Sequence, residues 1–221
     1  MSQSETIGRP RIGFACSVAT HTVSEARRLT GPTAQALADL TAIFDDLQFV
    51  LGCCERLLRE LAKAEHQDMV LVESLWAAAL NAYARCFRSG DDRPELTVDD
   101  VTATGLEGDV VPWHESLGKL RNFLVAKATN PREVFSVGVS VSAEGTAEGI
   151  VVSSIVMPVV DENTVRQTGR MAYELGQLVD GRIQDKQKAL FEEVKDMPAA
   201  RLSRLDKLPV DFSPADDPDQ A

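Results

Sequence analysis

The sequence contains few of the residue types on which metal sites and many catalytic sites depend. Among 221 residues there are three histidines, four cysteines, two tryptophans and two tyrosines. The cysteines form no CxxC pair and have no histidine at zinc-ligand spacing. We therefore expect no metal and no cofactor, and we interpret the cysteines as buried thiols in a reducing compartment.

Several catalytic motifs are also missing. The chain has no glycine-rich phosphate loop followed by Lys-Ser/Thr, no GxGxxG, no GxSxG and no HExxH. Acidic pairs such as Asp99-Asp100 are common on wet surfaces, so they do not by themselves predict a cation site. The common nucleotide-binding, serine-hydrolase and zinc-peptidase classes are therefore disfavoured.

The sequence has neither a long apolar run nor a basic block. No run approaches the roughly 18 residues of a membrane helix, and the first residues lack the apolar core of a signal peptide. We therefore expect a cytoplasmic protein without membrane contact. The net charge of −11 repels phosphate backbone and disfavours RNA as a general partner, although contact at a small site stays open.

A composition of 44% apolar and 26% charged residues indicates a globular core. Residues 1–32 are rich in Ser, Thr, Gly and Pro and predict an extended N-terminal arm. Residues 33–197 carry helical periodicity and predict one domain, whereas the acidic, proline-containing residues 198–221 predict a disordered tail. The predicted fold is mainly α, with a bundle of four main helices and an inserted β-hairpin at 134–160.

The first long helix carries apolar residues at alternating spacings of three and four. They are Leu37, Leu40, Phe44, Leu47, Leu51, Cys54, Leu58 and Leu61. Such a seam needs a partner helix. The favoured interpretation is a core helix of an intramolecular bundle, and the alternative is a self-association seam in a homodimer.

The later elements are predicted from changes of period. Helices are expected at 68–88, at about 113–128 and at 161–197, with an acidic loop at 96–112 that holds at most a short helix. Two β-branched runs around "SAEGTAEG" predict the hairpin, which must pack on the helices because two strands alone are marginal.

The last predicted helix contains three glycines, Gly169, Gly176 and Gly181. Each weakens a helix by roughly 1 kcal/mol relative to alanine. Close packing against another helix is the explanation we expect for them. Asp161 is the candidate N-cap of this helix.

The stretch "LRNFLVAKATNP" (120–131) holds the candidate chemistry. On a helix, His114 and Arg121 are seven residues apart and share a face. Asn122 follows Arg121, and Lys127 lies near the predicted helix end, where a cation favours the terminal carbonyls. The plainest interpretation is an ordinary helix in which Arg121 pairs with an acidic neighbour and His114 is a residue of the helix start.

The order of the predicted elements, with "WAAALNAYARCF" and "WHESLGKLRNFLVAKATNP", resembles the HEPN superfamily of helical proteins. The resemblance covers residues 33–197 in layout, and its specific part is 121–127. Catalytic members are thought to cleave RNA without metal, with an arginine followed by a polar residue and, further on, a histidine. Arg121 and Asn122 match the first two positions, but Lys127 stands at the histidine position.

This departure decides the predicted activity. An ordinary lysine, with a pKa of about 10.4, is protonated at neutral pH and cannot act as a general base. We therefore expect a non-catalytic or catalytically degenerate HEPN-like protein that acts through a protein partner or as a homodimer.

Two alternatives stay open, so whether the chain is an enzyme is undecided by sequence. One is a metal-independent ribonuclease using Arg121 and Asn122, with His114 or a lysine of shifted pKa supplying the missing group. The other is a nucleotide- or small-anion-binding module.

Overall fold

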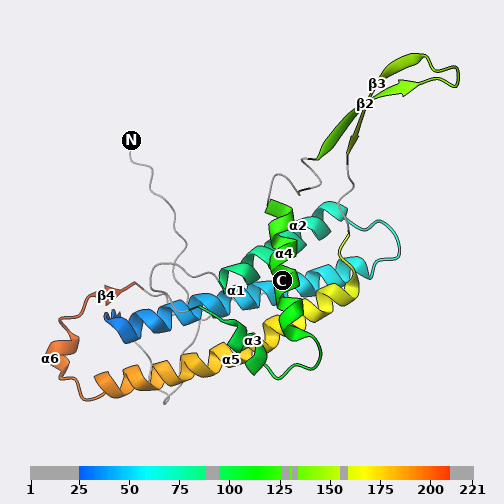
Figure 1. Cartoon of the computed structure of the whole chain (residues 1–221). Helices are drawn as coiled ribbons and strands as arrows, with labels where there is room; N and C mark the ends of the chain where they lie inside the picture. The colour runs from blue at the N-terminus through cyan, green and yellow to red at the C-terminus, as the bar shows by residue number, and fades with distance from the viewer. Residues whose placement is uncertain (1–24, 88–94, 126–129, 131–133, 155–158, 210–221) are drawn as a thin grey trace, which may run out of the picture. The chain divides into compact units, whose positions relative to one another are not determined.

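The computed structural model describes residues 25–87, 95–125, 130, 134–154 and 159–209. This part of the chain is mainly helical, as predicted, with six helices and two small pairs of antiparallel strands (Figure 1). The chain divides into two compact units, one formed by residues 39–181 and the other by the two chain ends, residues 1–38 and 182–221. The single domain between an N-terminal arm and a tail, at residues 33–197, stays a prediction.

Between residues 32 and 194 the helices and strands follow one another in the predicted order. The helices are α1 Pro32–Leu61, α2 Met69–Arg85, α3 Val98–Ala103, α4 Val110–Val125, α5 Glu162–Val194 and α6 Ala199–Leu202. The strands are β1 Ala26–Arg27, β2 Phe135–Val141, β3 Ala147–Ser154 and β4 Lys207–Leu208. Of these elements, β1, α6 and β4 were not predicted.

In the 39–181 unit, α1 and α5 approach each other closely at two of the glycines. A Cβ built on Gly169 would lie 3.4 Å from Cβ of Cys54, and one on Gly176 would lie 3.8 Å from the Gln48 amide nitrogen. Numbers rise along α5 as they fall along α1, so these stretches run antiparallel. Close packing is confirmed as the explanation for these two glycines. It is wrong for Gly181, because a Cβ built there would have no described atom of another element within 4 Å.

The buried stripe of α1 is offset from the predicted seam. Leu40, Leu47 and Cys54 are buried as core residues, but the other seam positions, Leu37, Phe44, Leu51, Leu58 and Leu61, are half-buried. Their place in the core is taken by Ile43, Val50 and Leu57. Much of the seam is therefore used inside the chain, and self-association through it stays a prediction.

Helix α2 is fixed to its neighbours at both ends. At its start the Asp68 N–H donates to the Glu60 carboxylate of α1 at 2.7 Å, and the Asp68 side chain caps α2 by accepting from the Leu71 amide at 3.0 Å. Near its C-terminal end, the Arg85 guanidinium pairs with Asp46 of α1. Helix α4 packs against α2 and α3. It begins at Val110 rather than near 113, because Pro112 is tolerated in a first turn, where its missing N–H would have no partner.

The acidic loop contains one short helix, as the sequence allowed. In α3 the Asp100 carboxylate accepts a hydrogen bond of 2.8 Å from the Thr97 backbone N–H. This contact across the first turn gives the Thr97 N–H an acceptor that the helix backbone does not provide.

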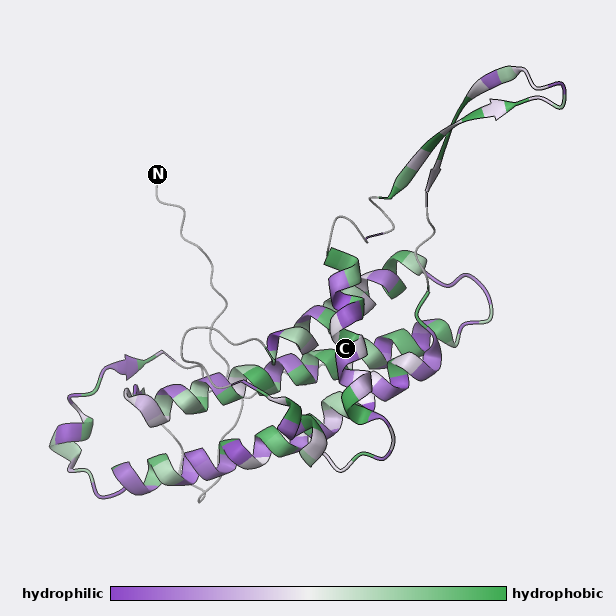
Figure 2. Cartoon of the chain, viewed as in Figure 1, coloured by the Kyte–Doolittle hydropathy of each residue, from purple (hydrophilic) through white to green (hydrophobic). Residues whose placement is uncertain are grey.

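The predicted hairpin is present as β2 and β3. Its turn closes with a 2.9 Å bond from the Ser142 N–H to the Thr146 carbonyl, and Gly145 adopts a φ of +84°, which favours glycine. The expectation that the strands pack on the helices is wrong, because both are exposed along nearly their whole length. Hydrophobic residues nevertheless run along them (Figure 2).

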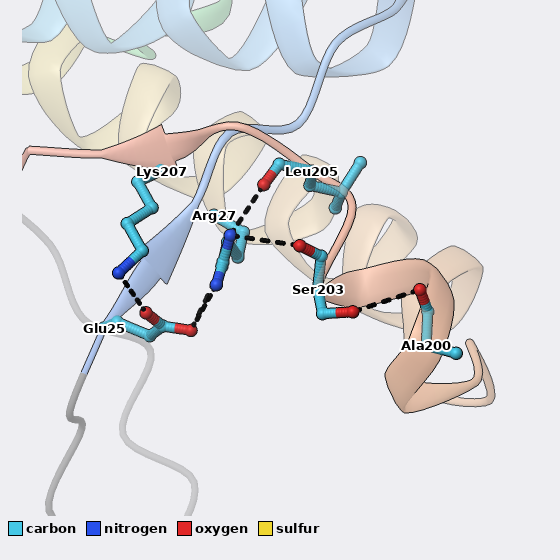
Figure 3. A network of polar contacts seen from close by, with 6 residues as sticks. All are labelled: Glu25, Arg27, Ala200, Ser203, Leu205 and Lys207. Carbon is cyan, nitrogen blue, oxygen red and sulfur yellow. Dashed lines mark hydrogen bonds and ion pairs between the residues drawn. The ribbon is translucent and has the colours of Figure 1, made fainter.

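Residues 25–31 of the expected arm and residues 198–209 of the expected disordered tail form ordered structure, whereas residues 1–24 and 210–221 lie outside the described residues. Strand β1 pairs antiparallel with β4, with Ala26 opposite Leu208. The Arg27 guanidinium donates to the carbonyls of Ser203, at 3.2 Å, and Leu205, at 2.9 Å (Figure 3). Glu25 accepts from Arg27 and forms an ion pair with Lys207, which lowers the pKa of its carboxyl. These contacts join residues about 180 positions apart, and patterns of residues that are close in sequence do not predict such contacts.

Candidate functional site

The guanidinium of Arg121 is held by two amides. Its Nε donates to Oδ1 of Asn81 at 3.4 Å, and one terminal nitrogen donates to Oδ1 of Asn122 at 3.2 Å. The Asn81 nitrogen donates to the Ala77 carbonyl of its own helix at 2.9 Å, which leaves its oxygen for the arginine. Among the described residues, the predicted pairing of Arg121 with an acidic neighbour is therefore replaced by contacts with two neutral amides.

His114 is tied to α2 by its ring. Its Nδ1 lies 2.9 Å from the Tyr83 hydroxyl, and its ring centroid lies 4.4 Å from that of Phe87. Burial lowers the pKa of His114 below its ordinary value, with Glu115 acting weakly in the opposite direction. The imidazole is therefore neutral at pH 7. Tyr83 is itself buried, which raises the pKa of its hydroxyl and keeps it protonated.

The shared face predicted for His114 and Arg121 is present, because both side chains contact residues of α2. Seven residues nevertheless separate them by about 10 Å along the α4 axis. Each is also oriented by its own partner, Tyr83 for the histidine and Asn81 for the arginine. A proton-transfer group must come within about 3 Å of the reacting atom, and the structure does not bring these two groups to a common atom.

The remaining predicted residue, Lys127, lies outside the described residues. Asn122, by contrast, is exposed and contributes its side-chain oxygen to Arg121. The arrangement that can be described is therefore an arginine held by two neutral amides and a neutral, separately held histidine. Such an arginine can bind an anionic group.

Asn81 and Tyr83 were not predicted from the sequence as partners of Arg121 and His114. Both lie in the quoted "WAAALNAYARCF" segment, where Asn81 is a lone amide among alanines and apolar residues. A polar side chain on an otherwise apolar helix usually has a hydrogen-bond partner, and this was the available signal.

An apolar cavity of about 580 Å³ lies beside this region. Its walls include Val72 and Trp76 of α2 and Leu120, Phe123 and Leu124 of α4. The charged residues that line it, Glu73 and Asp161, are both acidic, and Asp161 caps α5 by accepting from the Thr164 amide at 2.9 Å. The cavity is therefore a poor site for a phosphate or other anion.

The described cysteines agree with their interpretation as buried thiols. Cys53, Cys54 and Cys86 are free and buried. Burial raises the pKa of Cys54 and of Cys86 to about 12, and it also raises that of Cys53. These thiols are therefore protonated and unreactive at neutral pH. Cys16 lies outside the described residues.

Within the described ranges, no group of three or more His, Cys, Asp or Glu side chains is placed to hold a metal ion. None of the described helices is both long enough and apolar enough to cross a membrane.

Comparison with known proteins assigns neither a family nor a function to this chain. The chain matches no protein-family model, no curated protein and no solved structure. The HEPN resemblance therefore stays a prediction from the sequence motifs and the order of elements.

Proposed function

We propose that this chain is a non-catalytic, HEPN-like helical-bundle protein that acts by association, with the apolar face of the β2–β3 hairpin as its binding element. The favoured partner is a second copy of the chain. The observation that carries the proposal is the exposure of this face.

The hairpin register places apolar side chains together on one face. Val137 pairs with Val152 and Val139 pairs with Ile150, and residues directly opposite in an antiparallel pair share a face. Phe135 and Val141 extend the same row along β2 by the alternation of the strand. The exposed fractions of Val137 and Ile150 are 72% and 73%, although such residues are usually buried in folded proteins.

The exposed area is large enough for an interface. The apolar side chains of this face together expose on the order of 600 Å², which is at the upper end for the largest apolar patch of a monomer. Two such faces pressed together would bury about 1,200 Å², the lower end of the range for specific interfaces. A two-stranded sheet is also marginal alone and is stabilised when one face is covered.

Charge favours a second copy as the partner. The chain carries a net charge of −11, so most of its surfaces would repel a copy of themselves. In the two strands, however, the only charged residue is Glu148, and it lies at the irregularity in register near the turn. Two hairpin faces can therefore meet without placing like charges opposite each other.

The same proposal assigns Arg121 and His114 no catalytic role. It is supported by the separate partners of the two side chains, by the lysine at the motif's histidine position and by the acidic charge of the chain.

Two measurements test the proposal. Light scattering of the purified chain across a dilution series should give twice the monomer mass at high concentration. A strict monomer at every concentration would contradict association with a second copy. Incubation with mixed RNA in EDTA should give no cleavage, and cleavage that disappears in an Arg121→Ala variant would contradict the non-catalytic assignment and favour the ribonuclease alternative.

A further inference from the structure

A second cavity, of about 480 Å³, is separate from the hairpin and from Arg121. It is lined by residues 106–110 before and within the start of α4, by Pro112, Trp113 and Ser116 of α4, and by residues of α5 around Arg170. All of these residues belong to the 39–181 unit. Its volume is within the range of small-molecule sites in proteins.

The cavity contains charges of both signs that do not pair with each other. Arg170 lines it from α5, and Glu107 and Asp109 line it from the loop and the start of α4. No nitrogen of Arg170 lies within 4.0 Å of either carboxylate, and none of the three side chains has a hydrogen bond or ion pair with the described residues. Opposite charges thus line one cavity with space between them.

Gln167, which is exposed, and Trp113, which is half-buried, also line the cavity. The Gln167 amide, one turn before Arg170, makes no hydrogen bond with the described residues. The Trp113 indole Nε1 is buried and has no acceptor in the part of the chain that the structure describes. A buried donor without a partner is costly, and such a group in a folded protein calls for an acceptor from a ligand or a water.

The backbone presents the two acidic residues on either side of a glycine. Gly108, between Glu107 and Asp109, has a φ of +98°, a conformation that favours glycine. This turn is closed by a 2.9 Å bond from the Val110 N–H to the Gly108 carbonyl. The placement of both carboxylates at the cavity therefore depends on a specific local conformation.

We infer that this cavity binds a zwitterionic small molecule of amino-acid size with an apolar side group. Its carboxylate is held by the Arg170 guanidinium, with the exposed Gln167 amide as a further donor. Its ammonium group faces the carboxylates of Glu107 and Asp109. Its apolar group packs against Leu106, Val110 and the buried Met171.

Ligands of a single charge fit this site less well. A simple anion would be held by Arg170 but would face two carboxylates, and a simple cation would face the guanidinium. A molecule that carries both charges satisfies both sides, since each charged group of the ligand meets its opposite.

Isothermal titration of the full chain with leucine tests the inference, and leucinamide, N-acetyl-leucine and glycine serve as comparison ligands. Leucine should bind. Leucinamide lacks the carboxylate and N-acetyl-leucine lacks the ammonium group. Each should bind about tenfold more weakly than leucine, because each loses one charged contact. Glycine, which lacks the apolar group, should also bind more weakly. Absence of leucine binding at millimolar concentration would overturn the inference.

Variants assign the charges to residues. Arg170→Gln should remove the difference between leucine and leucinamide, while a Glu107→Gln, Asp109→Asn double variant should remove the difference between leucine and N-acetyl-leucine. Arg166→Gln is the matched control, because Arg166 lies one turn earlier on α5, pairs with Glu162 and does not line the cavity. If Arg170→Gln kept the leucine preference, binding would be adventitious and the assignment would be refuted.

Trp113 gives an independent readout. Leucine binding should change the tryptophan emission of the wild-type chain, and this change should disappear in Trp113→Phe, which keeps an aromatic ring but lacks the N–H. Persistence of the change in that variant would place the ligand elsewhere. Because these experiments use none of the hairpin residues, failure here leaves the association proposal intact.

Discussion

Substitution of Val137 by lysine should abolish association through the hairpin. Val137 lies near the middle of the apolar face, opposite Val152, and its exposed fraction is 72%. A fully exposed valine offers roughly 150 Å², so about 110 Å² would be buried per copy, equivalent to about 2.7 kcal/mol at 25 cal/mol per Å². A two-fold interface contains the residue twice, which gives about 5 kcal/mol and raises the dissociation constant at least a thousandfold.

Light scattering across a dilution series measures this change directly. Val137→Lys should remain monomeric at concentrations where the wild-type chain is dimeric. The matched control is Ser136→Lys, which adds the same charge one residue earlier, on the opposite face of the same strand, where Ser136 pairs with Ser153. This control should dimerise as the wild type does. Equal loss of dimer in both variants would show that added charge, rather than the apolar face, controls association, and would refute the reasoning.

Three further predictions concern stability. Because burial lowers the pKa of His114, the unfolded chain binds a proton more readily than the folded one as pH falls below about 6.5, so melting temperature should fall between pH 7.5 and 5.5. The melting temperature of His114→Gln should fall less over that interval, whereas that of His66→Gln, a control at an exposed position, should fall as much as that of the wild type. Equal falls in all three proteins would contradict the attribution of this pH dependence to His114. Gly52→Ala should stabilise the chain by about 0.5–1 kcal/mol in denaturant melts, because nothing lies within 4 Å of the added Cβ, whereas Gly169→Ala should gain less owing to its contact with α1. Arg27→Ala should weaken the β1–β4 pairing by about 2 kcal/mol, because it removes two charged hydrogen bonds. Hydrogen exchange would show this as faster exchange of the strand amides, and unchanged exchange would contradict it.

Local patterns in the sequence predicted most of the helices and their ends. The apolar period placed α1, α2 and α5 within a few residues of their observed bounds, and the predicted cap Asp161 accepts a hydrogen bond from a helix-start amide that has no partner within the helix. The hairpin was predicted from β-branched alternation and a glycine-containing turn. These features depend on residues that are close in sequence.

The candidate site was predicted less completely. The spacing of seven residues correctly placed His114 and Arg121 on one face of α4. It gave no information about Asn81 and Tyr83, which lie on another helix and hold the two side chains apart. The cavity of about 480 Å³ around Trp113 and Arg170 was not predicted at all, because its walls come from segments about 55 residues apart in sequence.

The sequence by itself determined the mainly helical class, the hairpin and the types of residue available for chemistry. Periodicity, capping and turn formation act over a few residues, so they can be deduced without the fold. Only the tertiary structure decided which apolar stripe of α1 is buried, that the β2–β3 face stays uncovered, and that β1 pairs with β4. These outcomes depend on contacts between segments that are far apart in the sequence. Burial and strand pairing arise from such contacts, so no single segment determines them.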